Sequence, residues 1–173
     1  MNFTRIAVAA TLAVGALSAQ AANPTVSVDQ SFAEYTGTGT VGNGQIDTNT
    51  FYWMFEGTGM YGGQAVNSWL IFWDPKGTAR VTGSVAFDAP ILHLFDTKVS
   101  LEATGALGFQ KSGVTYVYSN QVGLEGGGQD TVSYGGSTVT LNWYASDPGD
   151  HVRVMTAVPE PEAYALAFAG LGV

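Results

Sequence analysis

Short segments in which apolar and polar residues alternate restrict this chain to β-structure more than any other feature of its sequence. In ARVTGSVAFD, residues 79–88, Val81, Val85 and Phe87 fall on one face and polar residues fall on the other. A period of two with one apolar face is typical of a strand that is buried on one side. The same alternation recurs in four further segments, at residues 114–118, 131–134, 138–144 and 151–156.

Two other segments, 51–55 and 68–73, are continuous apolar runs apart from Ser68, which favours central strands covered on both faces. Turn signals rich in glycine, proline and aspartate separate all of these segments, at the spacing found in sandwiches and barrels. No stretch after the first 21 residues shows a helical period before Glu162. The sequence therefore predicts an all-β fold of about nine or ten strands in two packed antiparallel sheets, a jelly-roll-like β-sandwich. A closed β-barrel is the alternative.

The charge balance narrows the class of partner. Six basic residues against fourteen acidic ones give a formal net charge of −8. Nucleic-acid binding needs a basic face, and so does an electrostatic hold on anionic lipid, so neither partner is expected. An acidic surface suits neutral partners such as glycans, or divalent cations. The chain has no cysteine, which excludes disulfides and thiol catalysis.

Residues 1–21 have the composition of a secretory signal peptide. A basic residue precedes an apolar stretch that is long enough for a signal but short for a membrane span. Ala19 and Ala21 fit the small-x-small cleavage pattern, with the mature chain starting at or next to Ala22. The sequence therefore predicts a helical signal peptide, export of the protein, and a β-sandwich ectodomain over residues 22–157.

The segment 158–173 has a second distinctive pattern. Val158, Pro159, Glu160 and Pro161 are followed by an apolar stretch that predicts a short helix of about a dozen residues, where a span takes about 20. The motif and the apolar stretch resemble the PEP-CTERM sorting signal of Gram-negative bacteria. In that family a transmembrane helix and a cluster of arginines follow the motif. The segment matches only the first part of that pattern, so we expect the sequence to continue beyond it.

The resemblance implies where the protein is located. PEP-CTERM proteins are exported and handled by an exosortase, a membrane-bound enzyme that resembles cysteine proteases, and their genes accompany exopolysaccharide and biofilm production. We therefore expect an exosortase-type partner, and membrane contact only through the tail before processing. The expected location is the periplasm, the outer surface or the extracellular matrix. Segments 87–92, 113–116, 123–146 and 148–161 also resemble the uncharacterised ectodomain of some PEP-CTERM proteins. This second resemblance supports the architecture and assigns no activity to the chain.

No catalytic constellation stands out in the sequence. The G-x-S-x-G elbow of serine hydrolases and the H-E-x-x-H motif of zinc proteases are both absent. His93 lies in ILHLF and is expected to be packed or at a sheet edge. In the segment 151–156, alternation places Val152 inward, and both His151 and Arg153 outward into solvent. No catalytic residue and no obligatory cofactor are therefore predicted.

Two weaker patterns suggest ligands. Asp147 and Asp150 lie in a turn whose carboxylates and carbonyls are ligands that calcium accepts, so calcium is the one cofactor that the sequence leaves open. Sugars stack on exposed aromatic rings, and Trp53, Trp69 and Trp73 are the candidates for such a patch. The alternative is that the tryptophans have a purely structural role and fill the core.

These observations support two functions of different classes. The first is a surface-sorted, non-catalytic protein of the extracellular or biofilm matrix that contacts exopolysaccharide. The second is a secreted polysaccharide-acting enzyme that uses carboxylates which the sequence does not pair, or a calcium-dependent carbohydrate-binding module. The absence of a catalytic motif favours the first.

Overall fold

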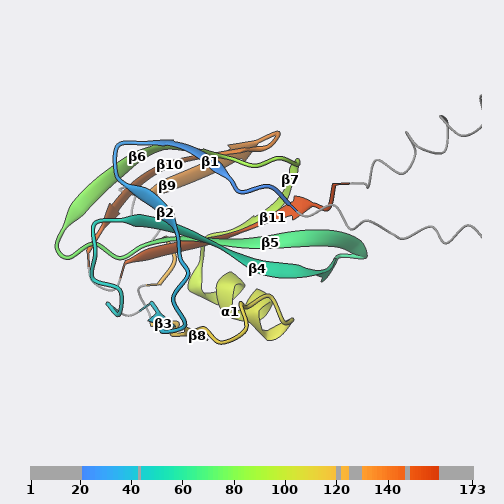
Figure 1. Cartoon of the computed structure of the whole chain (residues 1–173), viewed down its shortest axis with the longest axis horizontal. Coiled ribbons are helices and arrows are strands. Elements are labelled where there is room, and N and C mark those ends of the chain that lie inside the picture. Colours follow the sequence, from blue (N-terminus) through green and yellow to red (C-terminus); the bar gives the residue numbers. More distant parts are fainter. Residues whose placement is uncertain (1–20, 43, 120–121, 125–129, 147–148, 160–173) are drawn as a thin grey trace, which may run out of the picture. The chain divides into compact units, whose positions relative to one another are not determined.

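The computed structural model describes residues 21–42, 44–119, 122–124, 130–146 and 149–159. Within these ranges the chain forms β-strands and one helix (Figure 1). In chain order the elements are β1 (Thr25–Val28), β2 (Phe32–Glu34), β3 (Thr40–Val41), β4 (Phe51–Tyr61), β5 (Gln64–Trp73), β6 (Ala79–Ala86), β7 (Ile91–Phe95), α1 (Lys98–Ala106), β8 (Thr115–Tyr116), β9 (Thr131–Gly135), β10 (Thr138–Ala145) and β11 (Asp150–Ala157).

Two sheets pack face to face and confirm the predicted β-sandwich. One sheet has four strands in the order β1-β6-β10-β9, and the other has five in the order β2-β4-β5-β11-β7. All neighbours in these sheets are antiparallel except β2 and β4, which run parallel, so the second sheet is mixed. The described strands lie in separate sheets and do not close into the alternative barrel.

The main core lies between these two sheets. Strands β6 and β10 alternate as the sequence predicted, with Val81 and Val85 buried on one strand and Trp143 on the other. The five-stranded sheet contributes large aromatic and branched side chains from β4, β5 and β11. Burial of this apolar surface is the main force that holds the sheets together. The cluster of buried residues comprises Phe51, Trp53, Trp69, Ile71, Trp73, Val81, Val85, Phe87, Ile91, Val139, Leu141, Trp143, Ala145, Val152 and Val154.

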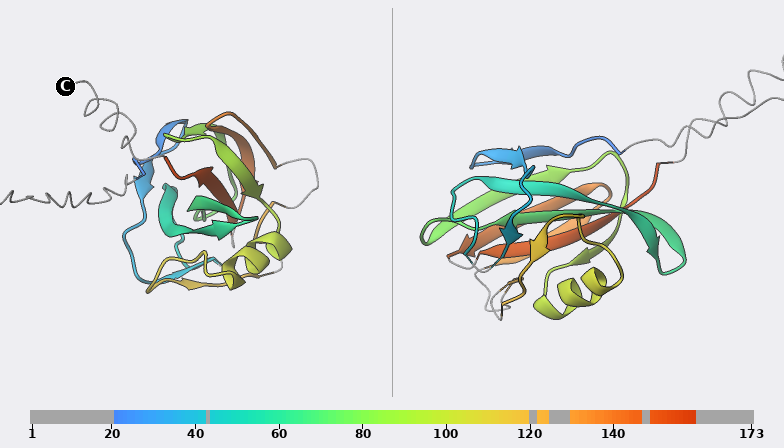
Figure 2. Two further views of the ribbon diagram at one scale, coloured as in Figure 1. Left: turned by 90° about the vertical axis from the view of Figure 1, so that its right-hand side faces the viewer. Right: turned by 60° about the horizontal axis from the view of Figure 1, so that its bottom comes forward.

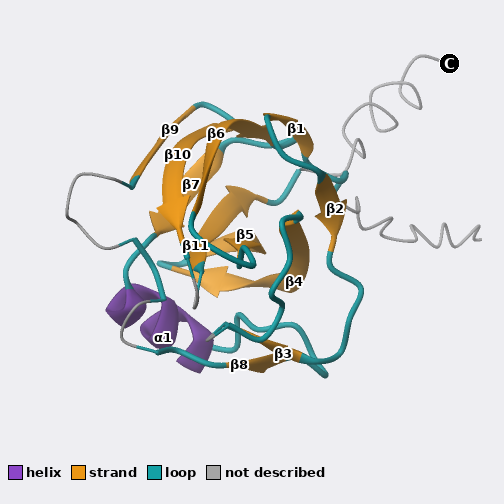
Figure 3. Ribbon diagram, turned by 90° about the vertical axis from the view of Figure 1, so that its left-hand side faces the viewer, coloured by secondary structure: helices purple, strands orange, loops and turns teal. Residues whose placement is uncertain are grey.

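A third layer covers the outer face of the five-stranded sheet. Figures 2 and 3 show α1 and the short β3–β8 pair on the side of that sheet away from the four-stranded one. Leu101 of α1 and Val41 of β3 pack there against Leu70 and Phe72 of β5. Strand β5 is therefore buried on both faces, as predicted from its apolar sequence.

Strand β11 contradicts the sequence-based prediction. His151 and Arg153 were expected to face solvent, but their exposed fractions are 1% and 0%. The alternation was correct, because these two residues do lie on the face opposite Val152. That face, however, is covered by the third layer instead of by water.

The helix α1 was also missed. Thr97 caps its N-terminus: the Thr97 side chain accepts from the backbone N–H of Ser100, and the Ser100 hydroxyl accepts from that of Thr97, which completes a capping box. The buried face of α1 consists of Leu101, Thr104 and Gly105, so a single large apolar residue marks it and the helical period is weak. The helices predicted for the signal peptide and the C-terminal apolar stretch lie outside the described residues. Within the described part, no helix combines the length and apolar character needed to cross a membrane.

Candidate functional site

The tryptophans proposed as sugar-stacking residues lie in the core. Trp53, Trp69 and Trp73 have exposed fractions of 5%, 1% and 0%. The indole N–H of Trp69 donates to the Thr156 hydroxyl at 3.2 Å, and that of Trp73 donates to the Asn49 carbonyl at 3.3 Å. Their ring faces are covered by neighbouring side chains. These three residues therefore do not form the candidate exposed aromatic patch; the alternative, that the tryptophans fill the core, is correct.

The calcium candidates are only partly described. Asp150 begins β11 beside Trp73 and is buried, whereas Asp147 lies outside the described residues. Asp74, which follows β5 directly, is also buried, and its carboxylate accepts from the backbone N–H of Ile46 at 2.9 Å. No group of three or more histidine, aspartate and glutamate side chains with metal-binding geometry occurs among the residues that are described.

The predicted cleavage site and the predicted sorting motif lie at the two ends of the described region. Ala21 and Ala22 are described and Ala19 is not, and the backbone N–H of Ala22 donates to Asp88 at 2.7 Å. Val158 and Pro159 directly follow β11. Glu160 and Pro161, the rest of the predicted sorting motif, lie outside the described residues.

The outer face of the four-stranded sheet is rich in hydroxyl groups, and we call it the polar sheet face. The strand register aligns Ser27, Ser84, Thr140 and Ser133 in one row across all four strands. Along each strand these residues alternate with residues on the face toward the core, so their own side chains point away from it. Most members of the face are exposed and the rest are half-buried. The polar sheet face comprises Thr25, Ser27, Arg80, Thr82, Ser84, Thr131, Ser133, Thr138, Thr140, Asn142 and Tyr144.

One end of the polar sheet face carries its only cation and its only aromatic ring. The Arg80 guanidinium carbon lies 5.4 Å from the centre of the Tyr144 ring, and its Nη1 donates to Oδ1 of Asn142 at 2.7 Å. Asp130 accepts from the backbone N–H of Tyr144. Asp29 accepts from the backbone N–H of Thr82 at 3.1 Å. This end therefore offers an exposed ring beside both donors and acceptors.

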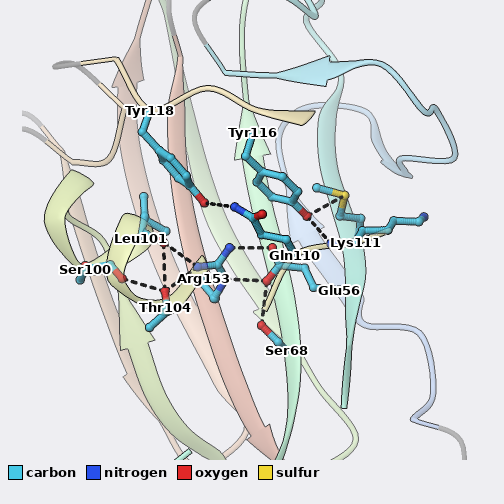
Figure 4. Close-up of polar contacts among 11 residues, drawn as sticks. Glu56, Ser68, Ser100, Leu101, Thr104, Gln110, Lys111, Tyr116, Tyr118 and Arg153 are labelled. Atoms are coloured by element: carbon cyan, nitrogen blue, oxygen red, sulfur yellow. Dashed lines mark hydrogen bonds and ion pairs between the residues drawn. The ribbon is translucent and has the colours of Figure 1, made fainter. Parts of the chain in front are cut away.

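A second polar group lies buried between β4, β11 and α1 (Figure 4). A β-bulge between Phe55 and Gly57 leaves Glu56 as an extra residue of β4. Its carboxylate receives Nε of Arg153 at Oε2, 2.6 Å away, and Nη2 at Oε1, 2.8 Å away. The Ser68 hydroxyl also donates to Oε2, at 2.7 Å. The two charges thus form a bidentate pair, and both side chains are fully buried.

The same guanidinium fixes the helix. Nη1 of Arg153 donates to the Leu101 carbonyl at 2.8 Å and to the Thr104 hydroxyl. Thr104 in turn donates to the Ser100 carbonyl at 2.7 Å. Arg153 therefore joins α1 to the sheet through polar contacts, which supplement the packing of Leu101. The arrangement supports the structure and leaves the Glu56 carboxylate neutralised by its partner.

The electrostatics of this region follow from burial and from the ion pair. Burial alone would lower the pKa of the Arg153 guanidinium, but the hydrogen bonds and charge of Glu56 outweigh it and raise that pKa above its usual value. Burial, and then the Glu56 charge, raise the pKa of the Tyr116 phenol. Burial, and then the charge of Arg153, lower the pKa of His151 to about 3, so this imidazole is neutral at ordinary pH.

Sequence reasoning missed both the polar sheet face and the buried pair. The alternating serines and threonines of β6 and β10 were treated only as the outward half of each strand. Glu56 directly follows an apolar run and Arg153 interrupts another. Opposite charges inside two apolar segments were the available signal for a buried pair. His93 is half-buried on the edge strand β7, with its ring centre 4.8 Å from that of Tyr61, in agreement with the prediction.

Comparison with known proteins does not assign this chain to a family. The chain matches no protein-family model, and it has no significant match among curated proteins or solved structures. The class that the fold defines is an all-β sandwich with an open polar sheet face, and the function is argued from its own residues.

Proposed function

We propose that this is an exported, non-catalytic protein of the surface or biofilm matrix of a Gram-negative bacterium, and that it contacts exopolysaccharide. The observation that carries the contact is the polar sheet face. Export is supported by the signal-like residues 1–21. Handling by an exosortase-type enzyme is supported by the resemblance of residues 158–173 to a PEP-CTERM signal.

The chemistry of the polar sheet face suits a sugar polymer. A hydroxyl both donates and accepts, so rows of serine and threonine can match the hydroxyls of a polysaccharide in many orientations. The rows extend across four strands, which gives an extended surface in place of a single deep site. Among the described residues, α1 and the β3–β8 pair cover the other sheet, whereas the outward residues of the four-stranded sheet are exposed or half-buried.

The test combines location with binding. The protein is followed by cell fractionation with an antibody raised against it, so that the motif at residues 158–161 stays intact, and the start of the mature chain is determined by mass spectrometry. The proposal predicts the surface or extracellular fraction and a mature N-terminus near Ala22. Purified protein is then applied to immobilised exopolysaccharide from the producing bacterium.

Retention that persists in chelator supports the proposal. Retention that requires calcium would favour the calcium-dependent binding module instead, with Asp147 and Asp150 as the candidate calcium ligands. A protein that stays in the cytosol with an intact N-terminus, or one that the exopolysaccharide does not retain, would contradict it.

A further inference from the structure

The end of the polar sheet face at Arg80, Asn142 and Tyr144 differs from the hydroxyl rows. Tyr144 is 43% exposed, and β9 pairs with β10 only as far as Asn142, so the ring lies at the end of the sheet with part of its surface accessible. Arg80 lies over the ring and is hydrogen-bonded to Asn142, so the three side chains hold one another in place at the surface. Side chains that are already ordered lose less entropy when a ligand binds.

Arg80 has donors left for a ligand. A guanidinium carries five N–H donors, and the one hydrogen bond found for Arg80 among the described residues uses one of them. Among those residues Arg80 forms no ion pair; the two pairs present are Lys98–Glu102 and Arg153–Glu56. An exposed cation beside an exposed ring can therefore meet ligand oxygens while the ring meets an apolar ligand face.

The local charge argues for a neutral ligand. Asp29 and Asp130 flank this end, and each is held by a backbone N–H of the sheet. Two carboxylates against one guanidinium leave the area acidic, and the whole chain carries −8. This area would repel an acidic polysaccharide, whereas a neutral polysaccharide carries no charge to be repelled.

We infer that this end of the polar sheet face is a binding subsite for a neutral polysaccharide. One sugar ring stacks its apolar C–H face on the face of the Tyr144 ring that Arg80 does not cover, which removes apolar surface from water. Hydroxyls of the same sugar bond to Arg80 and Asn142, and the polymer continues over the serine and threonine rows. The inference rests on the proposed function and names its ligand class and its central contacts.

Affinity electrophoresis of the full chain tests the inference. The gels contain galactomannan, dextran or hydroxyethyl cellulose as neutral probes, or alginate as the acidic probe. Tyr144→Ala and Arg80→Gln are compared with two matched controls. Tyr134→Ala removes an equally exposed ring on β9 whose register partner, Val139, faces the core, and Lys76→Gln removes a positive charge outside the sheet. Tryptophan fluorescence during unfolding verifies that each variant is folded.

The expected result is retardation by at least one neutral probe at both low and high salt. Tyr144→Ala should weaken it about tenfold or more, Arg80→Gln should weaken it less, and both controls should leave it unchanged. Retardation by alginate alone, or by none of the probes, would overturn the inference. Equal effects in the controls would also overturn it. If the native exopolysaccharide still retains Tyr144→Ala as strongly as the parent, the subsite fails and the proposed function stands.

Discussion

Replacing Glu56 by glutamine tests the buried ion pair. The change preserves the shape of the side chain but removes the charge that balances Arg153, and it turns one acceptor of the two guanidinium hydrogen bonds into a donor. Arg153 is fully buried and cannot turn to water. Removing one partner of such a pair typically costs about 3–5 kcal/mol. Since domains are stable by about 5–15 kcal/mol in total, Glu56→Gln should lose a large part of the unfolding free energy.

The assay is urea unfolding followed by tryptophan fluorescence, because all four tryptophans lie in the core. Glu102→Gln is the matched control: Glu102 pairs with Lys98 on the exposed side of α1, and loss of that pair should cost no more than about 0.5 kcal/mol. The double variant Glu56→Leu, Arg153→Met should be more stable than Glu56→Gln, because it leaves no buried charge. A loss below about 1 kcal/mol for Glu56→Gln would refute the reasoning.

Three further predictions concern His151, Gly83 and metal. Because the pKa of His151 is about 3 in the folded protein and near 6.5 when unfolded, only the unfolded chain binds this proton between those values, so stability falls as the pH drops through that window. Within that window this one group lowers the unfolding free energy by about 1.4 kcal/mol for each pH unit, and His151→Phe should remove that part of the pH dependence. His93→Gln, which leaves His151 in place, is the matched control. Gly83 has a φ of +149° and a Cβ there would lie 2.1 Å from the Ser27 carbonyl, so Gly83→Ala should detach β1; unchanged hydrogen-exchange protection of β1 would count against this. Chelator should leave the far-ultraviolet circular dichroism unchanged, since the core is apolar; loss of the β signal would indicate a structural metal.

The alternation of apolar and polar residues in the strands was enough to predict most of the fold. In β6 and β10 it placed Val81, Val85 and Trp143 inside, because one face of each strand meets the core and the other meets water. The same rule was wrong for His151 and Arg153, although they lie on the expected side of β11. A pattern of period two distinguishes the two faces of a strand, but it does not show what covers each face.

The third layer explains the remaining errors. It rests on α1, whose buried face has only Leu101 as a large apolar residue, and on the very short strands β3 and β8. Neither leaves a periodic signal of useful length. The helix was visible only in its cap at Thr97 and Ser100, a local feature that does not by itself predict where a helix packs.

The candidate site was missed for a different reason. Tryptophan was considered the natural sugar-stacking residue, yet the large indoles of Trp69 and Trp73 provide the volume that a small sandwich core needs. The exposed ring on the polar sheet face is instead Tyr144, on a strand whose polar residues were ascribed to solvent. Which outward face stays open depends on the covering layer, and that is set by contacts between segments far apart in the sequence.

The most direct test of the central claim is retention of two charge-matched variants by the exopolysaccharide of the producing bacterium. Thr140→Glu adds a carboxylate in the middle of the polar sheet face, whereas Ala103→Glu adds the same charge on the exposed side of α1. If the polar sheet face contacts the polysaccharide, the parent protein and Ala103→Glu are retained and Thr140→Glu is not. Equal retention of the two variants, or no retention of the parent protein, would contradict the account.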